Sequence, residues 1–136
     1  MIDEKDMAKE DFDKALSDLT EKLIATPLGA ELGLDEKQLE ASVSMAERAL
    51  ERGDAERAVR TYAVLILLQT DCVAYQLGTA RAAMAAHLAE VALMAASAVI
   101  ALRPTDPNGF YWSGMACMHM GEFALAIEDF TQCIDL

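Results

Sequence analysis

Apolar side chains near the start of the chain follow a helical spacing, at Phe12, Leu16, Leu19 and Leu23. Residues three and four apart share one face of an α-helix, so this stripe predicts a helix from about residue 6 to residue 25, ended by Thr26-Pro27. The stripe packs either on the elements that follow or against a second copy of the chain, and the pattern favours neither. Residues 1–34 thus form an N-terminal helix and linker.

Further along, residues of similar size return every 34 positions without a gap. Small residues form two columns, Ala46, Ala80 and Gly114, then Ala58, Ala92 and Ala126. Two further columns are Tyr62, Ala96 and Phe130, with an aromatic residue in the first and third copies, and Leu65, Val99 and Cys133. Small side chains allow two crossing helices to approach closely. The period predicts a repeat domain over 35–136 with helical hairpins at about 39–72, 73–106 and 107–136, the last incomplete.

Local signals place the ends of these helices. Asp35 is a predicted cap for a helix to about Arg52, and Gly53 turns the chain into a second helix that ends near Gln69. Asp71 is the predicted cap of the next helix. In Asp106-Pro107 the carboxylate caps the helix, and proline takes the first helical position without losing a hydrogen bond.

The third copy resembles the tetratricopeptide repeat most closely, with its aromatic, small and turn residues at Phe110, Gly114, Gly121, Ala126 and Phe130. The second copy departs from the pattern, because His87 stands where the other two turns have glycine. The resemblance implies an all-α fold of about three tetratricopeptide-like hairpins with an additional N-terminal helix.

Composition and charge argue against several classes of function and location. A net charge of -12 argues against nucleic acid as a partner, because binding to phosphate backbones depends on Lys and Arg. The first residues lack the basic start and apolar run of a secretory signal, and the apolar stretches are too short for stable membrane insertion. Three cysteines without paired spacing suggest reduced thiols. We therefore expect a cytoplasmic protein.

No motif indicates catalysis or a cofactor. The densest set of potential metal ligands is Met115, Cys117, Met118, His119 and Met120, but the repeat already assigns structural positions to several of them. Glu128 and Asp129 are expected on an exposed helical face, and there is no glycine-rich phosphate loop. The sequence predicts a non-enzymatic protein with no catalytic residue, no metal site and no cofactor.

In stacked hairpins of this kind the first helices line a concave surface. The register places nine residues there: Val43, Glu47, Leu50, Leu77, Arg81, Met84, Tyr111, Met115 and Met118. Most are apolar, and methionine adapts to different side chains, so the lining suits an extended peptide with hydrophobic anchors. A clamp for acidic peptides needs several basic residues, and Arg81 is the one basic member of this set.

The residues from Leu39 to Ala46, followed by Gly53, Ala58 and the stretch from Leu77 to Ala82, are similar to the repeat region of chaperones for type III secretion translocators. The resemblance covers about 39–136. It implies a cytoplasmic, often dimeric virulence protein that keeps membrane-inserting translocators soluble before export and grips a Pro-x-Leu-x-x-Pro-like segment. By register, the gripping residues are Val43, Leu50, Leu77, Met84, Tyr111 and Met115, with Arg81 holding a backbone carbonyl.

Two interpretations remain open. The first is a secretion chaperone whose clients are translocators, with a possible homodimer through the N-terminal helix. The alternative is a general tetratricopeptide scaffold for protein assembly. Because solenoids normally end in a polar capping helix, either the natural protein continues beyond Leu136 or another molecule covers this end, and we expect the first.

Overall fold

The computed structural model describes residues 10–15 and 33–136. Residues 10–15 are helical, and Phe12 is 67% exposed; the rest of the predicted N-terminal stripe lies outside the described residues. Six helices follow: α3 (Glu36–Glu51), α4 (Ala55–Leu68), α5 (Val73–Ala85), α6 (Ala89–Leu102), α7 (Pro107–His119) and α8 (Phe123–Asp135). The described part of the chain contains no strand. The predicted all-α fold is confirmed.

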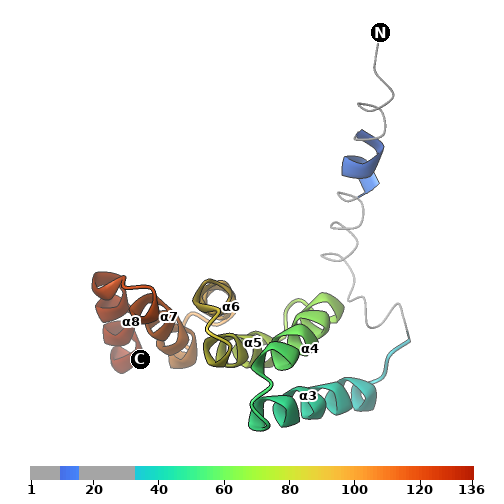
Figure 1. Cartoon of the computed structure of the whole chain (residues 1–136). Helices are drawn as coiled ribbons and strands as arrows, with labels where there is room; N and C mark the ends of the chain where they lie inside the picture. The colour runs from blue at the N-terminus through green and yellow to red at the C-terminus, as the bar shows by residue number, and fades with distance from the viewer. Residues whose placement is uncertain (1–9, 16–32) are drawn as a thin grey trace.

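The helices form three successive hairpins, α3–α4, α5–α6 and α7–α8, arranged in a row (Figure 1). Each helix packs against the helices before and after it in the sequence, and α5 also contacts α7. The second helices of the hairpins begin at Ala55, Ala89 and Phe123, which are 34 residues apart. The sequence period is therefore also the structural period.

The predicted small columns lie in the core. Ala46 and Ala80 are fully buried, as are Ala58 and Ala92, and Ala126 retains 3% exposure. In the third hairpin, a Cβ on Gly114 would stand 2.7 Å from Cε1 of Phe130, so only glycine lets this ring lie against the α7 backbone. The columns are small because the second helix of each hairpin approaches the first at these positions.

The three hairpin turns share one backbone geometry. Gly53, His87 and Gly121 all adopt positive φ, at 83°, 61° and 81°. In each turn this residue donates a backbone hydrogen bond of 3.1 Å to the carbonyl three positions back, and the next residue donates one to the carbonyl five positions back. This is the Schellman motif, which usually requires glycine. His87 accepts the left-handed conformation because the surrounding hairpin imposes it.

Helix capping follows the sequence prediction at Asp35 and Asp106 and departs from it at Asp71. Asp35 forms a reciprocal capping box with Gln38, Asp54 accepts from the Arg57 amide, and Asp106 caps α7 with proline behind it. The prediction that Asp71 caps the following helix is wrong. The N-cap of α5 is Cys72, which makes no side-chain capping bond, because the helix begins one residue later than the aspartate would require.

Candidate functional site: a groove along the first helices

The first helices of the three hairpins line a hollow of about 380 Å³. Its residues are Val43 and Glu47 of α3, Tyr62 of α4, Ala74, Tyr75, Leu77, Gly78 and Arg81 of α5, and Asn108 and Trp112 of α7. An adjoining hollow of about 340 Å³ is lined by Glu47, Leu50, Glu51 and Arg81. Since Glu47 and Arg81 line both, we treat the two hollows as one surface and call it the groove.

Gly78 and Tyr62 form the centre of the groove. Tyr62 comes from the second helix of the first hairpin and is 2% exposed. Its ring occupies the space where a side chain at Gly78 would stand, so the two hairpins meet ring against backbone. This contact brings α5 close to α4 and places Arg81, one turn beyond Gly78, beside the phenol.

The polar groups of the groove influence one another. Burial raises the pKa of the Tyr62 phenol above its ordinary value, and the nearby Arg81 guanidinium opposes part of that rise. Glu47 acts in the same direction as burial. The groove therefore holds one cation and one anion close to a neutral phenol, and these groups can hydrogen-bond to the backbone of an extended peptide.

Asn108 is placed by the cap of α7. Its backbone amide and its side-chain amide each donate to Asp106 Oδ1 at 2.9 Å. Asp106 thus holds the first turn of α7, and with it both Asn108 and, four residues on, Trp112. Trp112 is half-buried and makes an edge contact with Tyr111, with 5.0 Å between the ring centroids.

Five of the nine predicted binding residues line the groove: Val43, Glu47, Leu50, Leu77 and Arg81. The other four lie elsewhere along the first helices. Met84 is half-buried and packs against the core residues Ala83, Ala92 and Ala116. Met115 is also half-buried, whereas Tyr111 and Met118 are 41% and 45% exposed. Tyr111 lies between Trp112 and Phe130.

The prediction missed seven groove residues: Glu51, Tyr62, Ala74, Tyr75, Gly78, Asn108 and Trp112. The repeat could have indicated four of them, because Ala74 and Asn108 are 34 residues apart, as are Gly78 and Trp112. The projection used three positions per first helix, and these pairs occupy two more. Tyr62 and Tyr75 carry no such signal, since both also belong to the buried core.

The cluster of methionine, cysteine and histidine on α7 is divided among different environments. Cys117 is 3% exposed, whereas His119 is exposed and stacks on His87 at a centroid distance of 5.9 Å. Within the described residues there is no group of three or more His, Cys, Asp or Glu side chains that could hold a metal ion.

Asp129 corrects the expectation of an exposed carboxylate pair. Glu128 is exposed, but Asp129 is half-buried and accepts hydrogen bonds from Ser113 Oγ at 2.7 Å and Cys117 Sγ at 3.7 Å. Burial, followed by the nearby Asp129 carboxylate, raises the pKa of the Cys117 thiol. These hydrogen bonds connect α7 to α8 within the third hairpin.

Comparison with known proteins gives matches of two kinds. Residues 108–136 match the family model of the tetratricopeptide repeat. No curated protein sequence matches the chain.

Among the described helices, none has both the length and the apolar character needed to cross a membrane.

Several solved structures share the fold. The type III secretion translocator chaperone SycD of Yersinia enterocolitica is 17% identical, with a TM-score of 0.74 over 80% of this chain and 81% of SycD. PcrH, in complex with the chaperone binding region of PopB, is 21% identical, with a TM-score of 0.71 over 74% and 82% of the two chains. The second tetratricopeptide domain of Spaghetti (RPAP3), bound to an HSP90 peptide, is 21% identical, with a TM-score of 0.67 over 73% and 92%.

None of these proteins is named as an enzyme. The resemblance found in the sequence is therefore confirmed at the level of fold: the chain carries a tetratricopeptide repeat at 108–136, and its helical hairpins are arranged as in the translocator chaperones SycD and PcrH.

Proposed function

We propose that this protein is a non-enzymatic chaperone that binds an extended segment of a translocator protein in the groove and keeps that protein soluble before type III secretion. The observation that carries the proposal is the groove itself, which runs along α3, α5 and α7 and combines apolar walls with few polar groups. An extended peptide needs such a surface, because its apolar side chains supply most of the affinity and its backbone must still be hydrogen-bonded.

The lining indicates the chemistry of the client. Val43, Leu77 and Trp112 offer contacts for aliphatic or proline side chains, while Arg81 and Asn108 can donate to backbone carbonyls. Three buried anchors at roughly 1.5–3 kcal/mol each, less the cost of ordering the peptide, are sufficient for micromolar binding.

Three solved complexes of proteins with this fold support the proposal. PcrH has been seen with the chaperone binding regions of PopB and of PopD, and SycD with a peptide of the translocator YopD. The identities, between 19% and 21%, leave the client of this chain to experiment. Cytoplasmic location, a role in virulence and a homodimer through the N-terminal helix belong to the same proposal.

The alternative, a general assembly scaffold, makes a different prediction about ligands. The RPAP3 domain was solved with the acidic HSP90 peptide SRMEEVD. In the groove described here Arg81 is the one basic side chain, and Glu47 carries the opposite charge in the same hollow. We expect a translocator-derived Pro-x-Leu-x-x-Pro peptide to bind and the acidic peptide to bind far more weakly, because Glu47 repels it.

Trp112 provides a direct measurement, because it is the single tryptophan of the chain and lines the groove. Titration with the translocator peptide should change its fluorescence with micromolar affinity. Met84→Asp and Tyr111→Asp test the predicted lining beyond the groove, and Arg81→Glu should weaken binding modestly. If Arg81→Glu binds like the unmodified protein while either aspartate variant binds more weakly, the client segment lies along Met84 and Tyr111 and not in the groove.

Co-expression separates the two functions. A translocator chaperone should keep a co-expressed translocator in the soluble fraction, and Leu77→Asp should return it to the pellet. A translocator that remains insoluble with the unmodified protein would remove the chaperone proposal and leave the scaffold alternative.

A further inference from the structure

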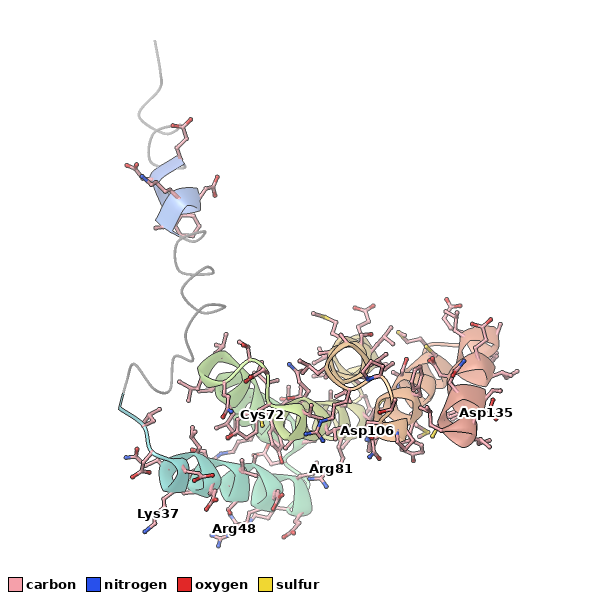
Figure 2. The ribbon with its side chains drawn as sticks, turned by 180° about the vertical axis from the view of Figure 1, so that it is seen from behind. Lys37, Arg48, Cys72, Arg81, Asp106 and Asp135 are labelled. Atoms are coloured by element: carbon pink, nitrogen blue, oxygen red, sulfur yellow. The ribbon has the colours of Figure 1, made fainter. Side chains whose placement is uncertain are left out.

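A second hollow, of about 200 Å³, lies at the turn between α3 and α4. Its lining is Met45, Arg48, Ala49, Arg52, Asp54 and Arg57, and it shares no residue with the groove. Figure 2 shows Arg48 on the opposite side of α3 from Arg81. We call this surface the arginine hollow.

The arginine hollow is a property of the first hairpin alone. One and two periods after Arg48 stand Ala82 and Ala116, both fully buried, in core clusters with residues of the preceding hairpin. Met45 is 57% exposed, whereas its counterparts Thr79 and Ser113 are each 5% exposed. The face that the later hairpins bury against their predecessor is thus open in the first, where it carries arginine.

Charge makes this face unusual in the molecule. The chain has a net charge of -12, with 11 Lys and Arg against 23 Asp and Glu, yet three of its arginines surround one small hollow. Arg48, Arg52 and Arg57 are all exposed. Asp54, the one carboxylate of the lining, already accepts from the Arg57 backbone amide at 3.3 Å as the cap of α4.

Part of the lining of the hollow is apolar. Met45, which is exposed, and Ala49, which is buried, line it together with the three arginines. Guanidinium groups pair with carboxylates through two parallel hydrogen bonds, and methionine accommodates an aliphatic side chain of varied shape. A free phosphate would use the arginines and leave the exposed Met45 uncovered, so the combination fits a peptide better than an inorganic anion.

We infer that the arginine hollow is a second docking site, which takes an acidic protein segment with an aliphatic side chain between its carboxylates. The hollow is lined by residues of α3, of α4 and of the turn between them, and Phe12, in the chain's own acidic stretch, is 67% exposed. Charge complementarity with the three arginines points to an acidic segment of another protein as the occupant. A chaperone with this site would hold a client in the groove and an acidic partner at the α3–α4 turn together.

The test uses a fluorescein-labelled peptide, acetyl-Glu-Glu-Leu-Glu-Glu-amide, and polarisation with the full chain in low salt. We expect the double variant Arg48→Gln/Arg52→Gln to bind about five- to tenfold more weakly, since exposed ion pairs are individually weak. Arg60→Gln/Arg103→Gln changes the net charge equally outside the hollow and should bind like the unmodified protein. Equal losses in both double variants, or no loss in the first, would overturn the site.

Further measurements distinguish a peptide from other occupants of the arginine hollow. Replacing the central leucine of the peptide by glycine should weaken binding to the unmodified protein, and this difference should vanish in Met45→Ser. Inorganic phosphate that displaces the peptide at equal concentration would mean a simple anion site. Binding to phosphatidylserine vesicles in place of the peptide would mean a membrane surface. Either result contradicts a peptide site.

Two controls separate this site from its alternatives. Glu10→Gln/Asp11→Asn/Asp13→Asn should leave peptide binding unchanged, and tighter binding would show that the chain's own acidic segment occupies the hollow, against the inference. Leu77→Asp should retain acidic-peptide binding while losing the translocator peptide, so failure of the groove proposal and failure of this one give different results.

Discussion

The first and third hairpins have the same turn geometry but present different surfaces. Around α3 and α4 the exposed positions are largely charged, including Arg48 and Arg57, whereas on α8 Phe123 and Ile127 are 63% and 66% exposed. Both hairpins nevertheless bury small residues at equivalent places. The comparison shows that the repeat constrains the positions where backbones approach and leaves the exposed positions free to differ in chemistry.

The two hairpins also use their aromatic column differently. Tyr62 lies against Gly78 of the following hairpin, while Phe130 lies against Gly114 of its own. The tyrosine therefore joins two hairpins and forms part of the groove, and the phenylalanine stabilises one hairpin internally. One sequence column thus has a binding-related role in one copy and a packing role in another.

The largest expected effect tests whether the client binds in the groove or along the third hairpin. Leu77→Asp places a charge in the middle of the groove and should lower the affinity for the translocator peptide by roughly 100-fold or more. Met118→Asp, at a position 45% exposed in the third hairpin, should lower this affinity only about threefold. Calorimetric titration measures both. Equal losses would extend the binding surface along all of α7.

Gly78→Val tests the contact between hairpins. The valine side chain would collide with the Tyr62 ring, and overpacking of this kind costs about 1–3 kcal/mol of unfolding free energy. Ala74→Val is the matched control, because Ala74 is exposed on the same helix and should change stability by less than about 0.5 kcal/mol. Urea denaturation measures both variants. Identical midpoints would show that the ring does not depend on the glycine.

The middle turn offers a test in the stabilising direction. His87 adopts φ of 61° where the first and third turns have glycine. A left-handed conformation costs a non-glycine residue roughly 1–2 kcal/mol, so His87→Gly should raise the unfolding free energy by about 1 kcal/mol after loss of the stacking with His119. Gly121→His should lower it by a similar amount. Thermal melts that move in the same direction for both would contradict this account.

The smallest effect concerns Cys117 in the third hairpin. Burial, and then Asp129, raises the pKa of its thiol, so the thiol remains protonated to higher pH than usual. Because the folded pKa is raised, the associated stability is fully present below the unfolded pKa and is lost as pH rises through the folded one. Iodoacetamide labelling near pH 8 should modify Cys133, which is half-buried, before Cys117. Mass spectrometry of the labelled peptides gives the order.

Much of the fold was predictable because it depends on local and periodic features. The 34-residue interval predicted which residues are small and buried, and the caps predicted at Asp35 and Asp106 follow from side chains that can accept the first amides of a helix. Asp71 failed as a cap because capping depends on the exact residue at which the helix begins, and α5 begins one residue later. Packing between hairpins decides such details.

The sequence by itself determined the helices, their period and the columns where they touch, since these follow from spacing and side-chain volume. Only the tertiary structure decided that Trp112 and Tyr62 share a hollow with Leu77, and that Arg48, Arg52 and Arg57 surround another. The physical reason is that a repeat specifies how one hairpin follows another, whereas a binding surface combines side chains from several helices whose relative rotation is set by the buried residues between them.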